Sequence, residues 1–180
     1  MPHILMIPGS LRAASSSRAT ARALAARLPE GTTYATADPG ALPHYNADVT
    51  DDPAVSAFIE EVRKADGLVF VTPEYNYSVP GVLKNAIDWA SRPAYESVFK
   101  GKPCFLVSTS GGALGGVRAQ SHLKYILNGM LAVVYPCKEI LVTMANTKVE
   151  DGLLTDDVVL DFAEVELAGF VASLGTTATA

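Results

Sequence analysis

The chain has 180 residues, of which 49% are hydrophobic and 18% charged, and its formal net charge at pH 7 is −5. A chain of this length is most simply one domain and buries about 70% of its unfolded surface, so its core can be large without disulfide bonds. The acidic balance argues against a nucleic-acid binder, no apolar stretch approaches the ~20 residues of a membrane span, and two cysteines are too few for a disulfide framework.

The first ten residues lack a basic region and a small-residue cleavage site, so we expect no secretory signal. Cys104 falls within a strand pattern, which favours a buried, inert thiol, and no Cys/His cluster indicates a metal. These features favour a reducing, cytoplasmic compartment without membrane or nucleic-acid partners.

In chain order, the apolar run His3 to Ile7 predicts a first strand, and Ser15 to Leu28 has one apolar face and predicts a helix. Thr32 to Ala37 is rich in β-branched residues and predicts a more exposed strand. Residues 38 to 52 have no strong period and predict a loop. A second helix is expected to begin at Asp52-Pro53, with the aspartate as N-cap and the proline at the first helical position.

Gly67 to Val71 is almost continuously apolar, as expected of a central parallel strand. A third helix is predicted to begin near Pro80. Pro103 to Val107 predicts a fourth strand, and Val117 to Met130 a fourth helix with one apolar face.

The fifth strand is predicted in two pieces, Val133-Val134 and Ile140 to Met144, on either side of Pro136. Asp156 to Val171 predicts the last helix, and the tail from Gly175 is expected to be frayed. Strands and helices therefore alternate along the whole chain.

This alternation predicts an α/β fold: a three-layer, doubly wound, five-stranded parallel sheet in a single domain spanning residues 1–180. With five strands, the flavodoxin-like order 2-1-3-4-5 is the natural choice. That order places the loops after strands one, three and four around one crevice at the point where the strand order reverses, which is where such sheets bind ligands.

The first of these loops, Gly9 to Arg18, places four serines and Arg12 directly before a helix. Free N–H groups at a helix start, hydroxyl donors and a guanidinium fork together suit a phosphomonoester. The same serines would also serve as ordinary N-caps with no ligand. Because capping needs one serine and no arginine, the pattern favours phosphate binding. Neither the P-loop pattern nor the dinucleotide fingerprint occurs here.

The second loop, Pro73 to Ser78, combines backbone polar groups with two tyrosine rings, which can hold a flat heterocycle. A helix start at Pro80-Gly81, with the tyrosines packed over the sheet end, explains this segment equally well. The third loop, Ser108 to Gly116, allows close backbone approach, although glycine turns without ligands are common. Three such loops at one sheet edge make a site, whereas one alone would not.

These residues resemble a known family, the NAD(P)H-dependent FMN reductases of flavodoxin-like fold, which include small bacterial quinone, chromate and azo reductases. The resemblance extends from Ile4 to about Thr155. It is carried by GSLR with the following Ser15, by PEYNYSVPGVLKNAIDW from Pro73 to Trp89, by TSGG-ALGG in the third loop and by the loop Leu42 to Asp48.

The resemblance implies FMN and NAD(P)H as cofactors and assigns roles residue by residue. The FMN phosphate would be bound by Ser10, Arg12, Ser15 and Ser17, the last standing where the family often has asparagine. The flavin ring would meet, mainly through backbone groups, Pro73, Glu74, Tyr75 and Asn76. The pyrimidine side of the ring or the ribityl chain would contact Ser110, Gly111 and Gly112.

The implied reaction is hydride transfer from NAD(P)H to flavin N5, followed by reduction of a small acceptor such as a flavin or a quinone. Because the cofactor carries the chemistry, no residue is assigned as a catalytic acid or base, and His44 and Arg118 receive no role. The family implies a homodimer or homotetramer with the flavin near the subunit interface. A flavodoxin-type electron carrier is the alternative, but Arg12 and a charge of only −5 argue against it. A hydrolase is poorly supported, since GxSxG does not occur.

Overall fold

The structure is a computed structural model that describes residues 1–175, so the expectation for the tail lies, beyond Gly175, outside the described residues. Its main sheet has the order β2-β1-β3-β4-β5, with β6 also paired to β4, and all of these pairings are parallel. The predicted fold class and strand order are therefore confirmed. The strands of this sheet are β1 His3–Pro8, β2 Thr33–Thr36, β3 Gly67–Pro73, β4 Pro103–Thr109, β5 Val133–Val134 and β6 Ile140–Val142.

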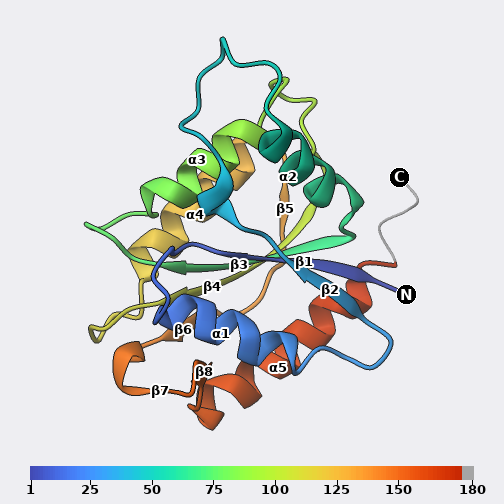
Figure 1. Cartoon of the computed structure of the whole chain (residues 1–180). Helices are drawn as coiled ribbons and strands as arrows, with labels where there is room; N and C mark the ends of the chain where they lie inside the picture. The colour runs from blue at the N-terminus through green and yellow to red at the C-terminus, as the bar shows by residue number, and fades with distance from the viewer. Residues whose placement is uncertain (176–180) are drawn as a thin grey trace.

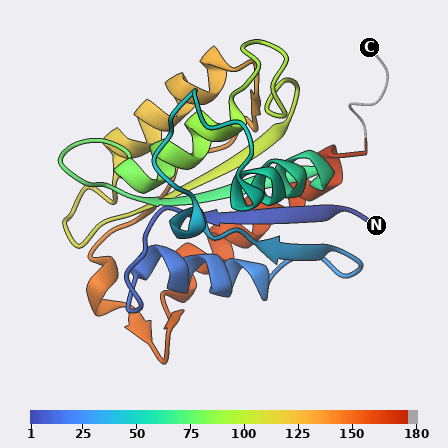
Figure 2. The same cartoon turned by 45° about the horizontal axis from the view of Figure 1, so that its top comes forward.

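Helices cover both faces of the sheet, which gives the three predicted layers (Figure 1). Helices α1 and α5 lie on one face, and α2, α3 and α4 lie on the other, as the turned view in Figure 2 also shows. Their bounds are α1 Ser16–Ala25, α2 Pro53–Lys64, α3 Gly81–Ala90, α4 Val117–Gly129 and α5 Asp157–Ser173.

The central strand β3 shows how the two cores form. Leu68 and Phe70 point to one face and Val69 and Val71 to the other, and all four are fully buried. This follows from the two-residue side-chain period of a strand that is covered on both faces. Helix residues that complete the two cores include Leu24 and Phe170 with the valines, and Phe58, Leu83 and Leu123 with Leu68 and Phe70.

Helix starts follow the predicted capping chemistry. The Asp52 side chain accepts hydrogen bonds from the N–H groups of Ala54 and Val55, at 2.9 and 3.0 Å, and Pro53 is the first residue of α2. Ser15 is the N-cap of α1. Helix α1 ends at Ala25, earlier than the predicted Leu28, because the chain tightens into turns with bonds from residue i to i+3.

The fifth strand is split into β5 and β6, and the side chain of Gln120 fills the gap between the two pieces. β5 pairs with Pro103 and Cys104 of β4, whereas β6 pairs with residues 107–109. Between them, the buried Gln120 amide of α4 donates to the carbonyl of Leu106 at 3.3 Å and to that of Ile140 at 3.2 Å. A side chain thus replaces part of the missing strand, which lets β6 run beside the carboxyl end of β4.

Short elements between β6 and α5 were not predicted. They are a 3₁₀ turn, η2 Ala145–Thr147, and a two-stranded antiparallel hairpin made of β7 Val149–Glu150 and β8 Leu153–Leu154. A further 3₁₀ turn, η1 Pro39–Ala41, lies in the loop after β2. Two or three residues cannot show a period, and apart from Leu153-Leu154 these short elements lack the apolar runs that indicated Val133-Val134 and Ile140 to Met144.

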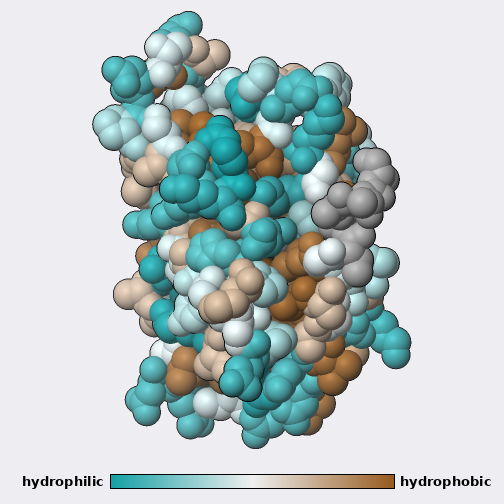
Figure 3. All heavy atoms as spheres, turned by 90° about the vertical axis from the view of Figure 1, so that its right-hand side faces the viewer, coloured by the Kyte–Doolittle hydropathy of each residue, from teal (hydrophilic) through white to brown (hydrophobic). Residues whose placement is uncertain are grey.

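The side of the molecule at which β1 begins has a largely hydrophilic surface with smaller hydrophobic areas between (Figure 3).

Cys104 is fully buried in β4, as predicted, and burial raises the pKa of its thiol. Within residues 1–175, no helix has the length and apolar content needed to cross a bilayer, and no three potential metal-ligating side chains cluster.

Candidate functional site

A crevice of about 120 Å³ lies at the carboxyl ends of β1, β3 and β4. It is the crevice that the strand order predicts, since β1 and β3 are neighbours where the order reverses. The residues that line it come from all three loops and from η2: Ser10, Arg12, Ser15, Ser16, Pro73, Glu74, Tyr75, Thr109, Ser110, Gly111 and Asn146.

The first loop brings hydroxyls, free N–H groups and a cation to one side of the crevice. Ser15 caps α1 by accepting a hydrogen bond from the Arg18 N–H at 3.3 Å. The N–H groups of Ser16 and Ser17, in the first turn of α1, have no partner among the described residues. The Arg12 side chain is exposed, and within residues 1–175 it forms no ion pair or hydrogen bond. This arrangement can bind an anion.

Ser17 lies behind the crevice rather than on its lining. Its hydroxyl is fully buried and hydrogen bonds to the Ser15 hydroxyl at 2.8 Å, so it fixes the rotamer of Ser15. Ser16, which the sequence analysis did not select, lines the crevice instead, and its hydroxyl donates to Thr109 at 3.5 Å. The helical period decides which of the consecutive serines faces the site, and the exact helix start was needed to place them.

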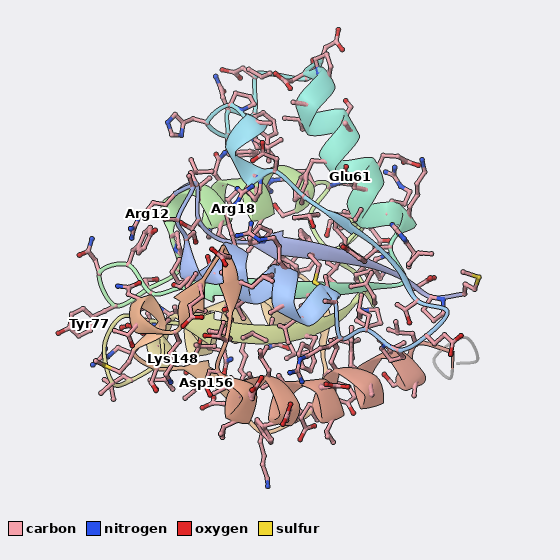
Figure 4. All side chains as sticks on the ribbon, turned by 60° about the horizontal axis from the view of Figure 1, so that its bottom comes forward. Arg12, Arg18, Glu61, Tyr77, Lys148 and Asp156 are labelled. Atoms are coloured by element: carbon pink, nitrogen blue, oxygen red, sulfur yellow. The ribbon has the colours of Figure 1, made fainter. Side chains whose placement is uncertain are left out.

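The second loop forms a tight two-residue hairpin. The N–H and C=O groups of Tyr75 and Ser78 bond to each other in both directions, at 3.0 and 3.1 Å. The two central residues, Asn76 and Tyr77, have φ values of 47° and 68°, as a type I′ turn requires. The turn directs the Tyr75 hydroxyl to Ser10 at 3.1 Å and leaves Tyr77 exposed at the same side of the molecule as Arg12 (Figure 4).

The Glu74 carboxylate is directed toward the start of α4. It accepts hydrogen bonds from the Arg118 side chain at 2.8 Å and from the N–H groups of Arg118 and Ala119 at 3.0 and 3.3 Å. Burial alone would raise the pKa of this carboxyl, but these hydrogen bonds outweigh burial and hold the pKa below its ordinary value. Glu74 therefore stays ionised at neutral pH, and only its backbone remains free for a ligand.

The third loop is held in place by the segment that follows β6. The Ser110 N–H donates to the Val142 carbonyl at 3.0 Å, and the Ala145 N–H donates to the Ser110 carbonyl at 2.8 Å. A Cβ atom on Gly111 would come within 2.6 Å of the Asn146 side-chain nitrogen, so a larger residue here would displace the Asn146 side chain. Asn146 thereby reaches the crevice from η2, and no sequence signal indicated it.

Two of the predicted ring contacts, Asn76 and Gly112, belong to the right loops but do not line the crevice. The loop Leu42 to Asp48 lies against α3, where the Trp89 ring nitrogen donates to the Pro43 carbonyl at 2.8 Å. His44 in this loop is exposed and is not among the crevice residues.

A parallel sheet of this order, with a crevice at its switch point lined by hydroxyls, a free guanidinium and a helix start, defines a flavodoxin-like mononucleotide-binding protein. The family model of the NADPH-dependent FMN reductases matches residues 2–147. The chain belongs to this family. It is an oxidoreductase that uses FMN and NAD(P)H.

Individual relatives agree with this assignment. The chain is 41% identical over 170 residues to an NAD(P)H-dependent FMN reductase of Pseudomonas aeruginosa, covering 91% of this chain and 90% of the relative. It is 40% identical over 174 residues to a quinone reductase of Escherichia coli K12, covering 93% and 92%. Among solved structures it is similar to FerB, a flavoenzyme NAD(P)H:(acceptor) oxidoreductase from Paracoccus denitrificans, with a TM-score of 0.87, 30% identity and 98% of each chain covered.

Proposed function

We propose that the phosphate of FMN binds at the first loop, with Ser10, Arg12 and Ser15 as direct contacts and Ser17 acting through Ser15. The observation that carries this proposal is the unpartnered Arg12 guanidinium beside the free N–H groups at the start of α1. An exposed arginine without a carboxylate partner and a helix start without a ligand both favour an anion. Two such groups at one crevice fit the phosphate of a mononucleotide.

The flavin ring is assigned to the turn that follows β3 and to the third loop. Its proposed contacts are Pro73, Glu74, Tyr75, Asn76, Ser110, Gly111 and Gly112. In support, the Glu74 side chain is committed to α4, which leaves the backbone of this segment as its polar contribution. Asn76 and Gly112 stay in this assignment because a flat ring extends beyond a crevice of this size.

When bound, FMN supplies the redox chemistry, accepting a hydride from NAD(P)H and then reducing the second substrate. The residues of the chain hold the phosphate, orient the ring and present backbone N–H donors at its pyrimidine end. Fixed donors of this kind stabilise negative charge that develops during a reaction. No side chain is assigned as a general acid or base.

A quinone is the proposed second substrate, because relatives of 40% identity or more are named quinone reductases. The test is steady-state oxidation of NADH and of NADPH with 1,4-benzoquinone as acceptor. We expect quinone-dependent turnover that requires FMN. Turnover with free flavin but none with quinones would overturn the proposed acceptor.

The phosphate assignment is tested by comparing FMN with riboflavin, which lacks only the phosphate. The apoprotein is titrated with each flavin, and binding is followed by flavin fluorescence. We expect FMN to bind at least a hundredfold more tightly, since two or more charged hydrogen bonds at about 1.5–3 kcal/mol each are lost with riboflavin. Equal affinities would show that the first loop does not hold the phosphate.

We also propose a homodimer or homotetramer, a cytoplasmic location and a single domain over residues 1–180. The oligomeric state rests on the resemblance to the family, and the two free thiols, Cys104 and Cys137, fit a reducing compartment. Light scattering on the purified protein tests the oligomeric state, and a monomer would contradict it.

Cell fractionation tests the location, and protein found outside the cytoplasm would contradict it. A single cooperative unfolding transition is expected of one domain, and two transitions would contradict it.

A further inference from the structure

The start of α4 is capped by a side chain from another loop. Its N-cap residue is Gly116, which has no side chain to accept hydrogen bonds. The Glu74 carboxylate takes this role, accepting from the N–H groups of Arg118 and Ala119 at 3.0 and 3.3 Å. These are the second and third N–H groups of the helix, which an N-cap side chain ordinarily satisfies. The loop after β3 is thereby fastened to α4.

Arg118 strengthens this connection through Glu74, before the turn, and through Tyr77, at its centre. Its Nη1 atom lies 2.8 Å from Glu74 Oε1, and its Cζ atom lies 4.3 Å from the centre of the Tyr77 ring. The Glu74 side chain is only 11% exposed and that of Arg118 is 40% exposed, so the ion pair is partly shielded from solvent. Four residues further along α4, the His122 ring lies 3.0 Å from the Ser78 hydroxyl.

These contacts surround a turn that is costly to form. Asn76 and Tyr77 both have positive φ, a region that bulky residues rarely adopt. Such conformations persist where neighbouring contacts hold them. Arg118 and His122 supply that support from α4, and Glu74, at the start of the loop, is held by the same helix.

We propose that Glu74 and Arg118 form a brace that holds the Asn76-Tyr77 turn in its FMN-binding conformation before the cofactor arrives. Both are positioning residues, and Arg118 serves the turn rather than a substrate phosphate. The inference rests on the proposed function in one respect, namely that this turn meets the flavin ring. The brace reduces the ordering that FMN binding must impose, which is how preorganisation raises affinity.

The first experiment measures the turn without flavin. Apoprotein is treated with a low concentration of chymotrypsin, which cleaves after tyrosine, and the early products are identified by mass spectrometry. Tyr77 and Tyr95 are 67% and 66% exposed in the folded protein, so Tyr95 is an internal reference. In Glu74→Gln and in Arg118→Gln we expect cleavage after Tyr77 to rise about tenfold or more, with cleavage after Tyr95 unchanged. An unchanged rate at Tyr77 would overturn the brace.

The second experiment measures FMN dissociation constants for the two single variants and the double variant. Each single variant is expected to weaken binding about ten- to a hundredfold, the range for loss of a charged hydrogen bond. If the two residues act as one unit, the double variant binds FMN no more weakly than whichever single variant binds it less tightly. Losses that add would show that the two residues act independently and would contradict the proposal.

Glu164→Gln is the matched control, because Glu164 also pairs with an arginine, Arg27, but does so between α5 and α1 away from the crevice. It should leave both measurements unchanged. If either glutamine variant fails to fold, seen as faster cleavage after Tyr95 as well, Arg118→Lys replaces it. Lysine keeps the charge without the guanidinium fork, so intermediate values of both measurements are expected, and wild-type values of both would overturn the brace.

The two proposals fail differently. If the wild-type apoprotein binds no FMN, the proposed function fails, while the cleavage comparison still tests the brace. If the wild type binds FMN and the variants bind it equally well, the brace is wrong and the proposed function stands.

Discussion

The hydroxyl groups of Ser10 and Tyr75 lie 3.1 Å apart and join the loop after β1 to the turn after β3. Ser16 and Thr109 make a similar but longer contact, at 3.5 Å, between the start of α1 and the end of β4. The three loops that meet at the crevice are therefore linked to each other by side-chain hydroxyls, and substitutions in one loop are expected to affect binding by the others.

Tyr75→Phe removes the hydroxyl that contacts Ser10 and leaves the ring in place. We expect FMN affinity to fall two- to tenfold, corresponding to about 0.5–1.5 kcal/mol for one neutral hydrogen bond. Isothermal titration of the apoprotein measures the change. Tyr34→Phe is the control, because Tyr34 is exposed on the edge strand β2 away from the crevice. A loss as large with Tyr34→Phe would mean that the Tyr75 contact is not the cause.

Arg12→Ala removes the one cation of the first loop that lines the crevice. FMN binding should weaken by about 1.5–3 kcal/mol, and the remaining affinity should depend less on salt, since an ionic contact is lost. The measurement is FMN titration at low and high ionic strength. Arg63→Ala, which breaks an exposed ion pair with Glu60 on α2, should have no effect. Unchanged FMN affinity in Arg12→Ala would show that Arg12 does not bind the FMN phosphate.

Gly116→Ala tests the backbone at the start of α4. Gly116 has φ 83°, and a Cβ atom there would lie 3.0 Å from the Thr109 carbonyl oxygen. We expect the free energy of unfolding to fall by about 1–3 kcal/mol, measured by urea denaturation. Gly81→Ala is the matched control at the start of α3, where nothing lies within 4 Å. It should be neutral or stabilising by up to about 1 kcal/mol, and a similar loss at both sites would contradict the role of φ.

Asp156→Asn tests the ion pair that fixes the hairpin to α5. Asp156 Oδ2 lies 2.6 Å from Lys148 Nζ, and the same carboxylate caps α5. The hydrogen bond from Lys148 lowers the pKa of Asp156; burial opposes this shift, and the Val159 N–H adds to it. Because asparagine caps helices as well as aspartate does, the variant removes mainly the charge, and a loss of about 0.5–1 kcal/mol is expected at pH 7.

The pH dependence of this loss has a definite sign. A carboxyl whose pKa is lower in the folded state stabilises the protein above its unfolded pKa of about 3.9 and loses that contribution as pH falls through the folded pKa. The difference in unfolding free energy between wild type and Asp156→Asn should therefore be constant near neutrality and shrink below about pH 4. A difference that persists at low pH would show that charge is not responsible.

The sequence by itself determined the fold and the three loops of the site. Strand and helix periods are properties of neighbouring residues, so Gly67 to Val71 and the Asp52-Pro53 helix start could be recognised locally. With the strands in order, the position of the crevice followed from topology, and loop chemistry pointed to Arg12 and the serines around it.

Only the tertiary structure decided which side chains face the crevice and which support it. Ser16 rather than Ser17 lines it, and Asn146 enters from η2, because these depend on where a helix begins and on how β6 lies beside β4. The pairing of Glu74 with Arg118 joins residues 44 positions apart, and their sequence spacing carries no sign of it. Local patterns set secondary structure, whereas contacts between distant segments exist only after the chain has folded.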